Sequence, residues 1–141
     1  MNEASAETRS VVVEREFPYP PEKIWRALTQ PHLIEEWLMK TDFKPVVGHA
    51  FNFRRTPRPD LNIVVDCRVL VIEPNRKLSY TWAARDLESV VTWTLTPTRT
   101  GTHLRMEQSG FRPDQKQAYG GAKGGWRQFF GALEQVLART E

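Results

Sequence analysis

The sequence contains one cysteine, Cys67, and three histidines, His32, His49 and His103, among its 141 residues. A single cysteine cannot form a disulfide within the chain. The histidines are scattered and do not have the spacing of zinc ligands. We therefore expect no disulfide and no metal site, and no motif in the sequence implies a cofactor.

Long apolar runs and a strong excess of one charge are also lacking. No run approaches the roughly 18 apolar residues of a membrane-spanning helix, and residues 1–10 lack the apolar centre of a secretory signal. Twenty basic residues are offset by seventeen acidic ones, with the two signs interspersed, so we expect no nucleic-acid partner. Together these features predict a cytoplasmic protein with no membrane span.

The densest basic stretch is "FRRTPRP", residues 53–59. Proline fixes the backbone and cannot donate a backbone hydrogen bond, which favours turns and loops. We therefore predict a solvated loop here rather than a patch that binds nucleic acid.

Familiar catalytic patterns are missing as well. No G-x-S-x-G nucleophile motif occurs, and no pair of carboxylates has a convincing placement for general acid–base catalysis. The acidic residues considered are Glu35, Glu36, Asp66 and Glu107, and helix spacing or strand parity puts most of them on outward faces. We predict no catalytic residue from these motifs.

Glycine is concentrated near the C-terminus, in "YGGAKGGWRQFFGALEQVL", residues 119–137. A phosphate-binding loop needs the pattern G-x-x-x-x-G-K-[ST], whereas Lys123 lies between two glycine pairs and Gly124 follows it. Because glycine weakens a helix by about 1 kcal/mol relative to alanine, residues 119–125 should be the loosest part of the last helix. We expect the entrance of any cavity to lie beside this segment.

Apolar periodicity predicts an α+β fold. Residues 11–17, residues 62–73 and several other segments alternate with the period of two expected for strands. Two short helices follow the first strand, at about residues 21–29 and after Pro31, and the final helix ends near Ala138. The order is one strand, two short helices, a run of antiparallel strands and one long helix. We expect residues 11–141 to form a single domain, preceded by a flexible N-terminal segment at residues 1–10.

Four segments resemble one known family: "PPEKIWRALTQPHLIEEWLM", "VLVIEPNRKLSYTW", "VTWTLTPTRTGTHLRMEQSGF" and "GGWRQFFGALEQVL". In this order they are similar to the activator of heat-shock protein 90 ATPase homologue family, part of the START-like helix-grip superfamily. The resemblance extends from about Val11 to Leu137. It implies a curved antiparallel sheet wrapped around the C-terminal helix, with a pocket between them for a small apolar or amphipathic ligand.

One position departs from the family pattern. Many members carry histidine before Ser-Gly-Phe, whereas this chain has Gln108 in "EQSGF". The change replaces a titratable ring by a neutral amide, which can still donate and accept hydrogen bonds. Acid–base chemistry at this position is therefore disfavoured.

The faces predicted to point inward are rich in aromatic side chains. Apolar ligand sites are lined by such side chains, with a few polar groups for orientation. We predict that Tyr80, Gln108 and Arg15 orient a ligand. The predicted wall consists of Trp37, Phe51, Phe53, Cys67, Val69, Trp82, Trp93, Met106, Trp126 and Phe130. The alternative is an ordinary core filled by the same side chains.

Arg15 lies on the otherwise apolar face of the first strand, with Val11, Val13 and Phe17. Because an unpaired buried charge is very costly, three arrangements are open. The guanidinium pairs inside the protein, extends to the rim of the sheet, or meets an anionic ligand.

The expected function is binding of a small hydrophobic or amphipathic molecule in an internal cavity, by a monomer or a homodimer. Two alternatives remain. One is a cyclase- or hydrolase-type enzyme that uses the same cavity, and the other is a chaperone-interacting module with a chaperone as its partner.

Overall fold

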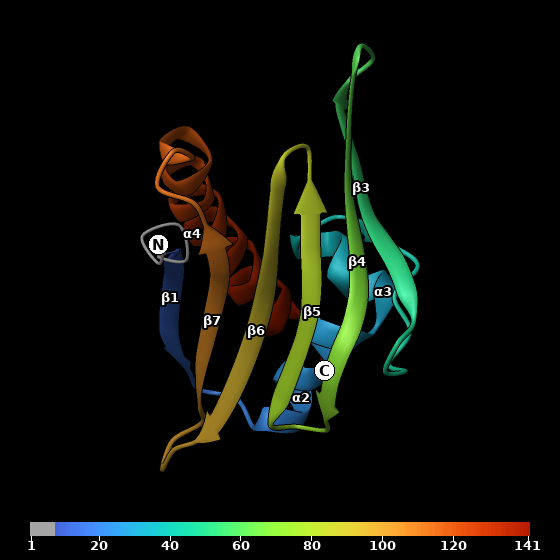
Figure 1. The fold of residues 1–141 in the computed structure, drawn as a ribbon. Coiled ribbons are helices and arrows are strands. Elements are labelled where there is room, and N and C mark those ends of the chain that lie inside the picture. Colours follow the sequence, from blue (N-terminus) through green and yellow to red (C-terminus); the bar gives the residue numbers. More distant parts are fainter. Residues whose placement is uncertain (1–7) are drawn as a thin grey trace.

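The computed structural model describes residues 8–141 as three helices on one face of a seven-stranded antiparallel sheet (Figure 1). The strand order is β1-β7-β6-β5-β4-β3-β2. The helices are α2 (Pro21–Thr29), α3 (Pro31–Trp37) and α4 (Lys116–Arg139). The strands are β1 (Arg9–Phe17), β2 (Lys40–Thr41), β3 (Ala50–Arg58), β4 (Leu61–Glu73), β5 (Lys77–Ala84), β6 (Leu87–Pro97) and β7 (Thr102–Phe111).

The N-terminal boundary differs from the predicted one. Of the segment predicted to be flexible, residues 1–7 lie outside the described residues, whereas Arg9 and Ser10 already belong to β1. Their register partners in β7 are Phe111 and Ser109. The first strand is thus two residues longer at its start than the alternation of apolar residues indicated.

The two short helices are confirmed at the predicted place. Pro21 and Pro31 each occupy the first turn of their helix, where a missing backbone N–H leaves no intrahelical hydrogen bond unmade. Ile24 and Leu28 of α2, with Ile34 and Trp37 of α3, form the buried stripes that hold both helices to the rest of the core.

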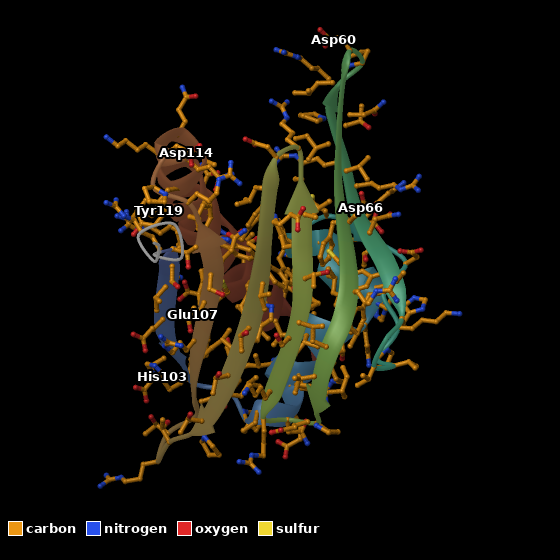
Figure 2. The ribbon with its side chains drawn as sticks, in the orientation of Figure 1. Asp60, Asp66, His103, Glu107, Asp114 and Tyr119 are labelled. Atoms are coloured by element: carbon orange, nitrogen blue, oxygen red, sulfur yellow. The ribbon has the colours of Figure 1, made fainter. Side chains whose placement is uncertain are left out.

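The prediction of a loop at residues 53–59 was wrong. β3 continues to Arg58, and its register against β4 shifts between Arg55 and Arg58. β2 pairs only with Phe53 and Arg54, so beyond these residues β3 has β4 as its sole strand neighbour. An edge strand with a bulge tolerates the missing N–H of Pro57. The hairpin of β3 and β4 extends far beyond its neighbours, with Asp60 at its tip (Figures 1 and 2).

The helix α4 completes the core on the helical face of the sheet. It contacts β1, α2 and α3, and it buries Trp126, Phe130, Leu133, Val136 and Leu137. The opposite face of the sheet is mostly polar, with His103 and Glu107 on β7 and Asp66 on β4, and it also exposes Val12, Val64 and Leu70 (Figure 2). This is the α+β helix-grip architecture that the sequence predicted.

Candidate ligand site

The predicted orienting residues Tyr80 and Gln108 lie in one row across the centre of the inner sheet face. Tyr80 of β5 is the register partner of Val91 in β6, and Val91 is in turn the partner of Gln108 in β7. The row continues to Val69 of β4 on one side and Val11 of β1 on the other. All five side chains are almost completely buried, and the two polar groups lie on either side of Val91.

The predicted wall residues are all buried and most belong to one aromatic cluster. Trp93 lies at its centre, with ring centroids 5.6 Å from both Trp37 and Trp126 and 5.8 Å from Phe130. Trp126 continues the cluster to Trp82 at 5.2 Å. These distances are typical of direct aromatic contact. In this state the space between the sheet and α4 is therefore occupied by side chains.

A chain of hydrogen bonds fixes the polar groups above this cluster. The indole N–H of Trp126 donates to Oε1 of Gln108 at 2.7 Å, and Nε2 of Gln108 donates to the Ser89 hydroxyl at 3.0 Å. Ser89 donates in turn to the carbonyl oxygen of Trp82 at 2.8 Å. The chain joins α4 to three strands of the sheet, and it accounts for the burial of Gln108.

The Tyr80 hydroxyl accepts a hydrogen bond but donates none within residues 8–141. Its hydroxyl oxygen accepts the indole N–H of Trp93 at 3.0 Å, and within residues 8–141 its own hydrogen meets no acceptor. The side chain is 3% exposed. A buried donor without a partner is uncommon and calls for an explanation.

Arg15 combines two of the three arrangements left open by the sequence. Its guanidinium pairs with Oε1 of Glu134 on α4 at 3.0 Å, and the side chains are 36% and 60% exposed. The guanidinium carbon also lies 5.8 Å from the centre of the Phe130 ring. Arg15 therefore forms an ion pair at the rim, outside the buried row of Tyr80 and Gln108.

The buried titratable groups of the described chain are held neutral. Burial raises the pKa of the Cys67 thiol well above its usual range, and the carboxylates of Asp66 and Asp42 add to this. Burial likewise raises the pKa of the Tyr80 hydroxyl, against a smaller opposing effect of the hydrogen bond from Trp93. The interior of residues 8–141 buries no lysine, arginine, aspartate or glutamate, so it suits uncharged chemical groups.

The helix α4 begins at Lys116, ten residues before Trp126, and the glycine-rich stretch lies inside it. A Cβ atom added at Gly120, Gly121, Gly124 or Gly125 would meet no heavy atom within 4 Å. At Gly101, by contrast, an added Cβ would overlap the backbone of Phe17. Close packing requires glycine at position 101 but not in α4, where its physical effect is to weaken the helix.

The centre of the cluster lines none of five depressions on the described surface. One of them reaches the edge of the cluster at Phe51 and Cys67, and no other predicted ligand-binding residue lines any of the five. The described residues contain no group of three or more histidine, cysteine or acidic side chains placed to hold a metal ion. No helix in the part of the chain described is long and apolar enough to cross a membrane.

Two contributors to the interior were missed in the sequence. Ser89 lies on the inner face with Val91 and Trp93 and receives the hydrogen bond from Gln108. Phe43 follows β2 and packs against Phe51 and Tyr80, with ring centroids 5.1 and 6.5 Å away. Extending the alternation of residues 91–95 backwards would have placed Ser89, whereas Phe43 stands in an irregular segment without periodicity.

Solved structures with this fold are numerous. Protein MLL2253 from Mesorhizobium loti is 67% identical over 94% of this chain and 99% of its own, with a TM-score of 0.87. DynU16, a protein of the dynemicin biosynthetic locus, is 25% identical over 92% of this chain and 47% of its own, with a TM-score of 0.80. CalU16 from Micromonospora echinospora is 22% identical over 94% and 78%, with a TM-score of 0.78, which shows a shared fold.

No curated protein sequence matches the chain. Residues 18–138, which include six of the seven strands, both short helices and all of α4 except Arg139, match the family described as "Activator of Hsp90 ATPase homolog 1-like protein". The match agrees with the helix-grip arrangement and with the four sequence segments that resemble this family. The chain therefore belongs to the family of activator of Hsp90 ATPase homolog 1-like proteins.

Proposed function

We propose that the chain binds a small, uncharged hydrophobic or amphipathic molecule between the sheet and α4. The observation that carries this proposal is the Tyr80 hydroxyl, which is buried among aromatic rings and has a hydrogen to donate. Gln108 lies in the same row and uses one of its two amide hydrogens for Ser89. Two hydrogen-bond donors among apolar side chains match the usual composition of a small-molecule site.

Binding requires the aromatic cluster to open, since its side chains now contact one another. The first half of α4 is the element suited to this movement, because it contains four glycines and none of its residues 116–125 is buried. Opening of the cluster requires this movement to extend as far as Trp126, the first buried residue of the helix, and to separate it from Gln108 and Trp82. The remaining predicted wall, including Phe51, Phe53, Cys67, Val69, Met106 and Phe130, would then face the ligand together with Trp37 and Trp93.

The polarity of the interior supports an uncharged ligand. Arg15, which we considered as a partner for an anion, is paired with Glu134 and lies at the rim. The buried titratable side chains of residues 8–141 are Cys67 and Tyr80, and both stay protonated from neutral into alkaline pH because burial raises their pKa values further. These groups donate hydrogen bonds, which favours binding over acid–base catalysis.

Native mass spectrometry of the protein purified from cells tests the proposal directly. A bound molecule should appear as an added mass that disappears on denaturation. In parallel, the neutral fluorophore N-phenyl-1-naphthylamine should bind with energy transfer from tryptophan. Tyr80→Phe should change the affinity for a carbonyl-bearing competitor such as 9-fluorenone, and it should leave the affinity for fluorene, which has no carbonyl group, unchanged. Absence of both an added mass and fluorophore binding would show that the core is simply filled.

A further inference from the structure

A second concave region lies at the edge of the sheet, where the end of α3 meets β2 and β3. It has a volume of about 560 Å³ and is lined by Glu35, Leu38, Met39, Lys40, Arg54, Arg55 and Thr56. Small-molecule sites have volumes of roughly 300–1,000 Å³. The region is large enough for a ligand, and none of its residues belongs to the aromatic cluster.

The lining combines an apolar floor with cationic walls. Leu38 and Met39 are 6% and 8% exposed, whereas Lys40, Arg54 and Arg55 are exposed. Three cations thus face one carboxylate, that of Glu35. An apolar surface beside an excess of positive charge is complementary to an amphipathic anion.

Some cations of the described surface have a carboxylate partner and others have none. Arg105, Arg112 and Arg139 each form an ion pair with a carboxylate. Within residues 8–141 no ion pair joins Lys40, Arg54 or Arg55 to a carboxylate, and the one bond of the Arg54 guanidinium goes to Oδ1 of Asn52 at 2.8 Å.

Two of these cations also oppose each other in the sheet. Lys40 of β2 and Arg54 of β3 are direct register partners, and like charges directly opposite destabilise an antiparallel pair. A second depression of about 200 Å³ adjoins the first and shares both residues, with Asp42 and Asn52 in its lining. Asp42 already accepts the backbone N–H of Asn52 at 2.9 Å. An anion placed between Lys40 and Arg54 would relieve the repulsion.

We propose that this depression is a binding site for a small amphipathic monoanion of the alkyl carboxylate class. The carboxylate lies between Lys40 and Arg54, with Arg55 on its other side, and the alkyl chain covers Leu38 and Met39. The site is separate from the space beneath α4 and does not depend on the function proposed for that space.

Titration of the isotope-labelled protein with octanoate, followed by amide NMR, tests the site. Octanoate should shift the signals of residues 38–40 and 54–56 and bind at least ten-fold more tightly than either acetate, which lacks the chain, or 1-octanol, which lacks the charge. Sodium chloride should weaken binding, because salt screens charges at an exposed site. Equal binding of octanoate and 1-octanol, or shifts confined to Val91, Trp93 and Gln108, would overturn the proposal.

Matched variants separate the site from general charge effects. Lys40→Gln and Arg54→Gln should each weaken octanoate binding about ten-fold, whereas Arg127→Gln, an exposed cation on α4, should change it less than two-fold. Without octanoate, the melting temperature of Lys40→Gln should equal or exceed that of the parent. Equal weakening by all three variants, or a lower melting temperature for Lys40→Gln, would contradict the assignment.

Discussion

The two halves of α4 belong to one continuous helix but differ in nearly every physical respect. Residues 116–125 contain four glycines and no buried side chain, whereas residues 126–139 bury five apolar side chains against the sheet and the short helices. Packing against the sheet and the short helices stabilises the second half. The first half has little to hold it, since most helix stability in proteins comes from the packing of an apolar face. The proposed function assigns anchoring to the second half and movement to the first half of this one helix.

The largest test of this comparison is truncation of an anchoring side chain. Phe130 is completely buried, so Phe130→Ala should lower the free energy of unfolding by about 3–5 kcal/mol. Tyr119, in the first half, is half-buried and its hydroxyl donates to the carbonyl oxygen of Ser10 at 3.3 Å. Tyr119→Ala should cost only about 1 kcal/mol. Urea unfolding of both variants measures the difference, and equal losses would break the contrast between the halves.

The junction between the halves depends on the bond from Trp126 to Gln108. Gln108→Leu leaves the buried indole N–H without an acceptor, which should cost about 1–3 kcal/mol of unfolding free energy. In the same background, Trp126→Phe removes the orphaned donor, so the double variant should be less destabilised than the sum of the single ones. Additive losses would show that this hydrogen bond does not couple α4 to β7.

The buried hydroxyl of Tyr80 predicts that the stability of the protein depends on alkaline pH. Burial raises the pKa of Tyr80 above its ordinary value of about 10. The folded protein therefore keeps a proton that the unfolded chain loses, and this contribution to stability is complete below pH 10 and declines above it. The decline should be about 1.4 kcal/mol per pH unit. Tyr80→Phe should remove this part of the decline and leave the part due to the buried thiol of Cys67. Urea unfolding at pH 9 to 11 measures it, and parallel pH profiles for the two proteins would argue against a buried hydroxyl.

The smallest expected effects are gains in stability when glycines of α4 are replaced by alanine. A Cβ atom added at Gly121 or Gly124 would meet no heavy atom within 4 Å. Gly121→Ala and Gly124→Ala should therefore each raise the free energy of unfolding by about 0.5–1 kcal/mol. Amide hydrogen exchange across residues 116–125 should slow in parallel, and N-phenyl-1-naphthylamine should associate more slowly if this half opens for ligands. Gly101→Ala is the opposing control and should destabilise, because its Cβ would overlap the backbone of Phe17. Unchanged exchange in α4 would show that the glycines do not loosen it.

Sequence patterns predicted much of this fold because the apolar periods are regular. Alternation along residues 62–73 and the prolines that begin α2 and α3 correspond to elements whose own residues determine them locally. The loop predicted at residues 53–59 failed because the sheet edge and a bulge accommodate Pro57, and an edge position is a property of the tertiary fold. For the candidate site, parity correctly placed Tyr80 and Gln108 inside. The pairing of Arg15 with Glu134 joins residues 119 positions apart, which no local pattern reveals.

The aromatic cluster also gives the protein an optical signal of its own. Four of its five tryptophans form a continuous series, Trp37, Trp93, Trp126 and Trp82, with neighbouring ring centroids 5.2–5.6 Å apart. Indole rings in such contact couple electronically and produce a near-ultraviolet circular dichroism signal that depends on their mutual orientation. Because Trp126 alone in this series belongs to α4, any displacement of that helix from the sheet would change the signal while the strands stay in place. Opening of the helix can thus be followed in the unmodified protein, without an attached label.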